Sequence, residues 1–321
     1  MRTMTEKQKT DESRKARLGA VIAAAGAPGG FRAYDRLAHT EGTDMVRRMI
    51  GTFRRAGVEE IAVITGYRAE ETEKSLAKQG VVFLRCENYE TAQMLDFAVM
   101  GIRYLAKTCG RFYFCPSDVP LFEEHTLRMM AGEDAPVVIP VYRGRKGHPV
   151  LINASLAGQI ASYRGDRGLK GAIDAAGVPV SFVAVEDGGV LLRAREEDRF
   201  EEVAGREKPV PVHPRVKVQL VRNVPFFGPG LMNLLRQIEV LGNVREACEK
   251  TGMSYSKGWT LIRTAEKELG YVIVERSPGG KHGGSARVSS RGRTLMEQYE
   301  TMGRRIASFA EEEYRKIFEG E

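Results

Sequence analysis

Hydrophobic and polar positions follow two periods in the first two thirds of the chain. Short apolar runs at 18–26 (LGAVIAAAG), 58–66 (VEEIAVITG) and 81–86 (VVFLRC) predict buried strands. Further strands are predicted at 111–118 and 135–144, and helical spacing of apolar residues at 43–57, 69–80, 91–108 and 121–133 predicts the helices between them. This alternation predicts an α/β fold with a Rossmann-like parallel sheet covered on both faces.

A proline-rich segment interrupts this pattern. Pro209, Pro211 and Pro214 stand close together among charged residues, where they disfavour helix and stiffen the chain. We therefore expect a disordered tail over residues 1–17, an α/β domain over 18–205, a linker over 206–213 and a second domain over 214–321.

The pattern beyond the linker is mainly helical. It predicts a strand at 216–223, a helix at 228–242, a short helix at 243–252 with Asn243 as its N-cap, and a third helix at 254–270. Two strands around a glycine-rich tip follow over 271–292, and a final helix runs from about 291 to 318. The tight turn at Gly252 separates two short helices, so this order predicts a winged helix-turn-helix domain that binds double-stranded DNA.

The start of the third helix supplies groups that suit phosphate oxygens and base edges. Arg263 lies two helical turns further along the same stripe, and the glycine-rich tip adds a cation near the DNA backbone. The expected DNA contacts are Ser254, Tyr255, Ser256, Lys257, Arg263, Lys281 and His282. A helical adaptor with an ordinary basic surface is the alternative interpretation.

Charge adds to this picture. The net charge is +7, and residues 206–321 carry +6 of it, with 20 Lys and Arg against 14 Asp and Glu. A basic half beside a neutral half favours a polyanionic partner, although an ordinary solvated surface would show the same balance. The sequence has no apolar run of 18 residues, no secretory signal and no C-x-x-C spacing, so we expect a cytoplasmic protein without membrane contact, disulfides or a zinc site.

Residues 226–292 also carry a family resemblance, sharpest in GMSYSKGW and GGKHGG. They resemble the DNA-binding domain of the ModE family of molybdate-responsive regulators, which are LysR-like winged helices. The resemblance implies a homodimer and a link to molybdenum-cofactor metabolism. The C-terminal molybdate-binding domains of that family are absent from this sequence, which stops at Glu321. We therefore expect residues 1–205 to sense any ligand.

The first domain resembles the MobA-like nucleotidyltransferases of molybdenum-cofactor biosynthesis. The shared segments are AAAG, GVEEIAVITGY, PSDVPLF and GRKGHPVLI. The resemblance implies that a nucleoside triphosphate binds in the first loop, that two aspartates hold Mg²⁺, and that a molybdopterin-like substrate accepts the nucleotide. The implied nucleotide-binding residues are Ala25, Gly26, Gly29, Gly30, Arg32 and Arg36. A purely structural turn is the alternative for this loop.

The implied site is incomplete. Asp118 matches the first metal aspartate, and His148 matches the substrate-side motif. The lysine expected in the loop falls near Asp35, and the second metal aspartate falls at Arg193 and Arg195, whose guanidinium groups cannot coordinate Mg²⁺. Asp118 as the cap of a turn, and His148 as a hydrogen-bonded turn residue, are the structural alternatives.

Two hypotheses follow. In the first, the domain is a degenerate nucleotidyltransferase that binds a nucleotide or pterin-like ligand through Arg193 or Arg195 and controls the DNA-binding half. In the second, it is an active Mg²⁺-dependent transferase of CTP or GTP in which Asp118 is catalytic. Under both, Cys115 is expected to be a buried, unreactive thiol.

Overall fold

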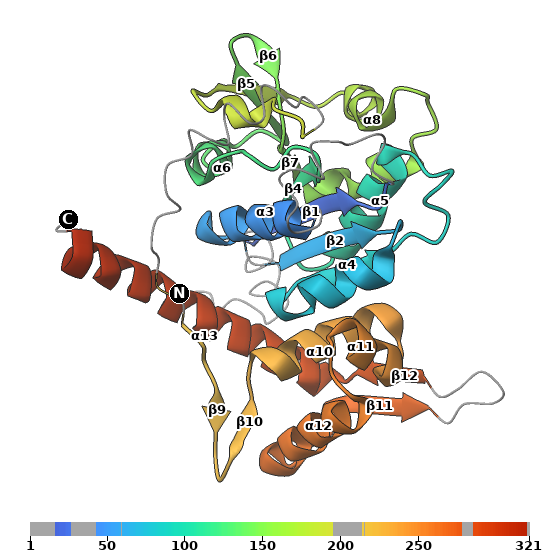
Figure 1. Cartoon of the computed structure of the whole chain (residues 1–321), viewed down its shortest axis with the longest axis vertical. Helices are drawn as coiled ribbons and strands as arrows, with labels where there is room; N and C mark the ends of the chain where they lie inside the picture. The colour runs from blue at the N-terminus through green and yellow to red at the C-terminus, as the bar shows by residue number, and fades with distance from the viewer. Residues whose placement is uncertain are drawn as a thin grey trace, which may run out of the picture. The chain divides into compact units, whose positions relative to one another are not determined.

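A computed structural model describes residues 17–26, 43–58, 60–194, 214, 216–277 and 285–319 (Figure 1). The chain divides into two compact units, unit 1 over Met1–Arg206 and unit 2 over Glu207–Glu321. Each unit has its own hydrophobic core.

Unit 1 is built on a sheet of eight strands in the order β3-β2-β1-β4-β7-β5-β6, with β8 paired to β5. Its centre is parallel and consists of β1 (Leu18–Ala24), β2 (Glu60–Thr65), β3 (Val82–Arg85) and β4 (Arg111–Pro116). The remaining strands are β5 (Val137–Tyr142), β6 (Arg145–Lys146), β7 (Val150–Asn153) and β8 (Val180–Ala184).

The expected parallel sheet is found in the core, but the later strands depart from it. β7 runs antiparallel to both β4 and β5, and β6 runs antiparallel to β5. Only short connections link β5, β6 and β7, whereas a parallel pair needs a crossover of a dozen residues or so. The sheet is thus a mixed one with a parallel core.

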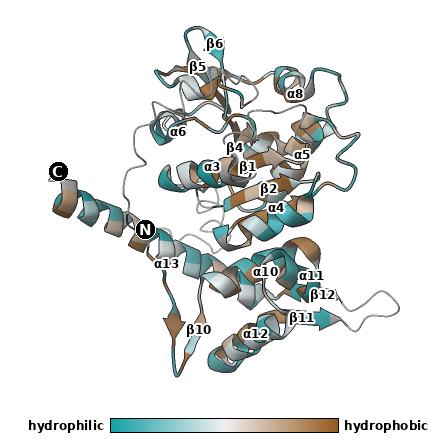
Figure 2. Cartoon of the chain, viewed as in Figure 1, coloured by the Kyte–Doolittle hydropathy of each residue, from teal (hydrophilic) through white to brown (hydrophobic). Residues whose placement is uncertain are grey.

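Helices cover both faces of this sheet, as the sequence pattern predicts (Figure 1). One layer contains α3 (Thr43–Arg55), α4 (Ala69–Leu76) and α6 (Glu124–Ala131). The other contains α5 (Met94–Leu105), α7 (Ala157–Ser162) and α8 (Gly168–Ala176). Short 3₁₀ turns are η1 (Ala77–Gln79), η2 (Ala154–Leu156) and η3 (Gly188–Val190). Figure 2 shows β1 and β2 as hydrophobic elements and the outer side of α4 as hydrophilic.

Unit 2 is helical with two small sheets. Its elements are β9 (Leu220–Val221), β10 (Pro225–Phe227), α10 (Pro229–Leu241), α11 (Val244–Lys250), α12 (Tyr255–Leu269), β11 (Val274–Ser277), β12 (Ser285–Val288), α13 (Ser290–Tyr314) and the π-helical η4 (Arg315–Glu319). β9 pairs with β10, and β11 pairs with β12, both antiparallel. The strand expected over 216–223 is shorter than predicted and is confined to Leu220–Val221.

The turn between α11 and α12 follows the local predictions. The side chain of Asn243 accepts hydrogen bonds from the first turn of α11, and Gly252 has a left-handed backbone with φ +66°. Gly258 brings α12 against α11, because a Cβ at this position would overlap Cys248 Sγ. The two helices are therefore locked in close contact. Among the described residues, no helix is long and apolar enough to cross a membrane.

Candidate functional site

The strands of the parallel core end at one edge of the sheet of unit 1. There the backbone N–H of Ser117 donates to the carbonyl of Ala23 at 3.0 Å, and that of Tyr67 donates to the carbonyl of Ala25 at 2.9 Å. The strand order changes direction between β1 and β4, and ligands of open α/β sheets bind at such switch points.

The structure places part of the expected nucleotide loop at this edge. Ala25 is fully buried beside the end of β2, and Gly26 is exposed after it. The other expected loop residues, Gly29, Gly30, Arg32 and Arg36, lie outside the described residues.

Asp118 and Arg193 form an ion pair just beyond β4. Arg193 Nη1 donates to Asp118 Oδ2 at 2.7 Å, and the side chain of Arg193 is 32% exposed and that of Asp118 20%. The backbone holds the two segments together, because the N–H of Ala194 donates to the carbonyl of Asp118 at 2.7 Å. The second carboxylate oxygen, Asp118 Oδ1, is buried and has no hydrogen-bond partner among the described residues. The guanidinium therefore occupies one side of the carboxylate that the family resemblance assigns to a metal.

His148 lies beside this pair. Its backbone N–H donates to the carbonyl of Val190 at 2.8 Å, and its ring Nδ1 is buried and finds no hydrogen-bond partner in the described part of the chain. Burial, reinforced by the positive charge of Arg193 and opposed by Asp118, lowers the pKa of His148 to about 4. The imidazole is therefore neutral at pH 7 and adds no cation to the site.

Asp187 is a positioning residue that sequence reasoning missed. Its Oδ2 accepts hydrogen bonds from the N–H of Glu123 at 2.7 Å and the hydroxyl of Thr126 at 2.8 Å, and its Oδ1 accepts from the N–H of Gly189 at 2.9 Å. Burial raises the pKa of Asp187, and these hydrogen bonds oppose that shift. The carboxylate thus ties η3, which carries the Val190 carbonyl, to the start of α6.

Cys115 is fully buried, as expected, and burial raises the pKa of its thiol well above the ordinary value. A thiol that stays protonated is a poor nucleophile, so Cys115 belongs to the core of the sheet.

The described residues show no preformed magnesium site. Among them, no three His, Cys, Asp or Glu side chains come together in a way that could hold a metal. One carboxylate oxygen of Asp118 already accepts a hydrogen bond from Arg193, and the guanidinium would repel a divalent cation beside it. The second predicted arginine, Arg195, lies outside the described residues.

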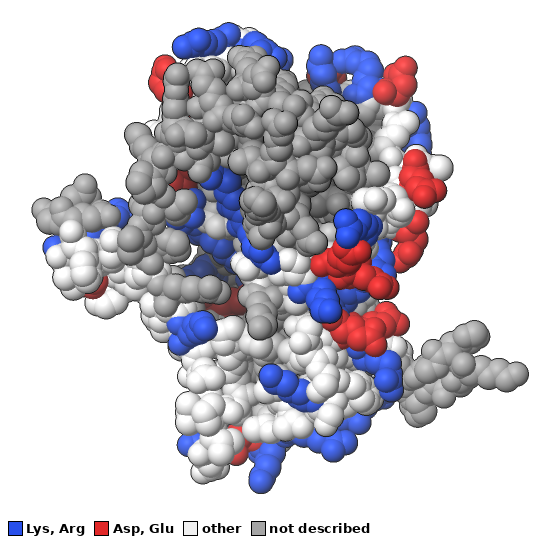
Figure 3. Space-filling model, viewed as in Figure 1, with Lys and Arg blue, Asp and Glu red and all other residues white. Residues whose placement is uncertain are grey.

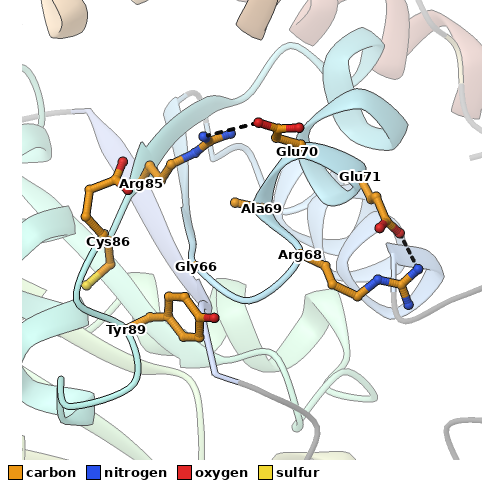
Figure 4. A pocket seen from close by; sticks show the side chains of 9 residues that line it. Gly66, Arg68, Ala69, Glu70, Glu71, Arg85, Cys86 and Tyr89 are labelled. Atoms are coloured by element: carbon orange, nitrogen blue, oxygen red, sulfur yellow. Dashed lines mark ion pairs between the residues drawn. The ribbon is translucent and has the colours of Figure 1, made fainter.

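A hollow of about 310 Å³ opens where β2 and β3 end (Figure 4). The residues around it include Gly66, Arg68, Arg85 and Tyr89, none of which sequence reasoning singled out. Both arginines are paired with carboxylates of α4: Arg68 with Glu71, and Arg85 with Glu73 at 2.8 Å and Glu70 at 3.9 Å. The hollow is therefore electrically mixed rather than cationic.

The outer face of α12 in unit 2 has a different character. Ser256, Thr260, Arg263 and Lys267 are exposed at helical spacing. The acids of α12 are Glu266, which accepts hydrogen bonds from the N–H groups of Ile273 and Val274, and Glu268, which accepts from Asn223. The exposed stripe therefore carries cations without acids, and Figure 3 shows few acidic atoms around α12.

The predicted DNA contacts at the start of α12 are also exposed. Ser254 caps the helix by accepting the N–H of Lys257 at 3.2 Å, and Tyr255 is 43% exposed. Two arginines that the sequence pattern did not indicate, Arg245 and Arg276, lie against aromatic rings of α12. The tip residues Lys281 and His282 lie outside the described residues.

Comparison with known proteins defines the class of unit 1. A solved 4-diphosphocytidyl-2C-methyl-D-erythritol synthase from Anaerococcus prevotii aligns with a TM-score of 0.50 at 13% identity, over 61% of this chain and 99% of that one. The fold of unit 1 is thus that of an α/β nucleotidyltransferase. Residues 20–180, half of the chain, match the MobA-like NTP transferase domain, and the chain belongs to this family.

The C-terminal region is distantly similar to molybdenum-related proteins. The regulator ModE of Escherichia coli K12 is 30% identical over 77 residues, which are 24% of this chain and 29% of ModE. The molybdenum-pterin-binding protein MopA of Rhodobacter capsulatus is 33% identical over 72 residues, which are 22% of this chain and 27% of MopA. The chain thus matches less than a third of the length of either relative.

Proposed function

We propose that this protein is a DNA-binding transcriptional regulator linked to molybdenum-cofactor metabolism, in which a nucleotidyltransferase-like domain senses a ligand. The observation that carries the proposal is the exposed face of α12, which presents no carboxylate. The two acids of this helix, Glu266 and Glu268, accept hydrogen bonds from neighbouring segments instead. An electrostatic surface of this kind suits the phosphates of duplex DNA.

The arrangement of unit 2 supports a winged helix-turn-helix. α11, the turn at Gly252 and α12 have the order of that motif, and the β11–β12 pair supplies the wing. In such domains the second helix enters the major groove with its N-terminal residues on the base edges. Here those residues are Ser254, Tyr255, Ser256 and Lys257. The similarity to the DNA-binding transcriptional dual regulator ModE supports the same function. A homodimer, which the family resemblance implies, would bind a two-fold-symmetric site.

The ion pair between Asp118 and Arg193 supports the sensor role of unit 1. A guanidinium beside the sheet's switch point can bind a phosphate or another anion directly, without a metal. A nucleoside triphosphate or a molybdopterin-like compound has the required charge, and His148 would lie beside it as a neutral group.

The DNA hypothesis is tested by salt-dependent binding of the full chain to a duplex from its own upstream region. Lys257→Ala and Arg263→Ala should each weaken binding by about 1 kcal/mol or more and lower the salt slope by about one. Lys316→Ala is the matched control, because Glu313 already neutralises Lys316 at the far end of the last helix. Equal affinity for the upstream duplex and a random duplex would refute specific regulation.

The sensor hypothesis is tested by thermal unfolding with CTP, GTP, ATP, molybdate and pterin compounds, each with Mg²⁺ and with EDTA. A ligand that binds the native state raises the melting temperature. The expected result is a rise that persists in EDTA. A rise that requires Mg²⁺ would favour the second candidate.

That second candidate is an active transferase of CTP or GTP, favoured by membership of the NTP transferase family and by the unpartnered Asp118 Oδ1. It predicts release of pyrophosphate with a molybdenum-cofactor acceptor, and loss of that release in Asp118→Ala. No release in the presence of Mg²⁺ or Mn²⁺ would leave the sensor role as the function of unit 1.

A further inference from the structure

Two arginines of unit 2 lie over aromatic rings of α12. The guanidinium of Arg245, in the first turn of α11, is 4.7 Å from the ring centre of Tyr255. That of Arg276, on β11, is 3.6 Å from the ring centre of Trp259. The two rings meet edge to face with centres 6.1 Å apart. We call Arg245, Tyr255, Trp259 and Arg276 the cation–aromatic ladder.

The ladder keeps its charge available. Arg245 and Arg276 are exposed, and within the described part of the chain neither forms an ion pair with a carboxylate. An aromatic ring covers the flat face of a guanidinium but leaves its N–H edge free to donate. Each arginine is thus a fixed cation with its hydrogen-bonding edge open.

Such a cation suits a phosphate diester. A guanidinium binds two phosphate oxygens through parallel N–H groups, and a side chain already held by a ring loses less rotational freedom on binding. The ladder also joins three elements, α11, α12 and β11, with one cation over each ring.

We propose that the cation–aromatic ladder is a docking surface for the DNA backbone. Arg245 and Arg276 contact phosphates, and Tyr255 and Trp259 are positioning residues that hold the two guanidinium groups in place. This inference rests on the proposed DNA-binding function and adds backbone contacts from α11 and β11 to those expected from α12.

The single tryptophan of the chain is the natural reporter, because Trp259 is part of the ladder. A fluorescently labelled duplex is titrated with the full chain, and duplex anisotropy and tryptophan emission are followed together. Both signals should change with the same midpoint. Arg245→Gln and Arg276→Gln should each weaken binding about tenfold and lower the salt slope by about one.

The positioning role is tested by variants that remove no charge. Trp259→Leu should weaken binding severalfold, whereas Trp259→Phe, which keeps a ring under Arg276, should restore most of the affinity. Arg276→Lys keeps the charge and should retain the salt slope, but it should bind less tightly because a lysine lacks the flat fork. Arg293→Gln is the control, since Glu239 already neutralises that exposed arginine.

The outcomes separate the inference from the function on which it rests. Unchanged affinity and salt slope in both Arg245→Gln and Arg276→Gln, with normal duplex binding by the unsubstituted chain, would overturn the ladder alone. Absence of duplex binding by the unsubstituted chain at low salt would overturn the DNA-binding function and the ladder with it. The two arginine variants decide the matter even if Trp259→Leu fails to fold, because both sites are exposed.

Discussion

Arginines are used in opposite ways in the two units. Arg193 of unit 1 donates to a carboxylate that is mostly buried, so the two charges cancel where a metal is expected. Arg276 of unit 2 lies on an indole ring, which orients the guanidinium, and no carboxylate of the described residues pairs with it. Arg193 thus neutralises a carboxylate within unit 1, whereas Arg276 presents its charge at the surface of unit 2.

The difference shows that the partner of an arginine matters as much as its presence. A carboxylate partner makes a nearly neutral patch, which an incoming anion has to disrupt. An aromatic partner makes a rigid cation, which an incoming anion can bind directly. The comparison therefore predicts weak, selective anion binding in unit 1 and strongly salt-dependent binding in unit 2.

The largest expected effect comes from Gly258→Ala. The new Cβ would overlap Cys248 Sγ and push α11 away from α12, which should destabilise unit 2 by about 2–3 kcal/mol. Because the same movement separates Arg245 from Tyr255, DNA affinity should fall although no charge is removed. Thermal unfolding and duplex titration measure the two effects.

A second substitution checks this explanation. Cys248→Ala should restore much of the stability of Gly258→Ala, because it removes the overlapping sulfur. Gly303→Ala is the control, since a Cβ there meets no atom within 4 Å and helix propensity should add about 0.5–1 kcal/mol. Equal losses in Gly258→Ala and Gly303→Ala would show that close helix contact is not the cause.

The next effect concerns the ion pair of unit 1. Arg193→Asp places two carboxylates together, which should destabilise unit 1 by about 2 kcal/mol in EDTA, and millimolar Mn²⁺ or Mg²⁺ should reverse most of this loss. Melting temperatures with and without metal provide the measurement. Arg193→Asn, which adds no carboxylate, should not respond to metal. An equal metal response in the unsubstituted chain would contradict the idea that Arg193 replaces the ion.

The smallest of these effects at neutral pH is a pH dependence, which appears only below about pH 6.5. Because the pKa of His148 is about 4 in the folded chain and ordinarily 6.5, the unfolded chain takes up the proton first as the pH falls. The folded state therefore loses stability as the pH falls from 6.5 to 4, by up to about 3 kcal/mol at pH 4. The difference between the unsubstituted chain and His148→Asn isolates this contribution, and the histidine resonances report the pKa itself. A normal pKa for His148 would show that the imidazole is not buried as described.

Much of the fold follows from the sequence because the signals are local. The N-cap at Asn243 and the left-handed turn at Gly252 need only the residues around them. The arrangement of the later strands could not be predicted from the sequence. β6 has only two residues, and β8 is mostly half-buried or exposed, so neither shows a clear alternation of buried and exposed positions.

The candidate sites show the same limit. Asp118, His148 and Arg193 were indicated by family resemblance, and the described fold brings them together. Asp187 accepts hydrogen bonds from Glu123 and Thr126, which lie far from it along the chain, and from Gly189 across a turn. Arg245 and Arg276 become neighbours of one row of rings only after α11, α12 and β11 pack, so no spacing in the sequence marks them.

The ion pair between Asp118 and Arg193 also has a consequence for ligand thresholds. The Asp118 carboxylate competes with any incoming anion for the Arg193 guanidinium. Because both groups belong to the same chain, Asp118 acts at an effective concentration of about millimolar or higher. An anion that reaches Arg193 has to outcompete Asp118, which favours ligands carrying several charges over single phosphates. In the proposed sensor, Arg193 therefore stays paired with Asp118 at low ligand concentrations, and a polyphosphate-like anion displaces Asp118 only at higher concentrations.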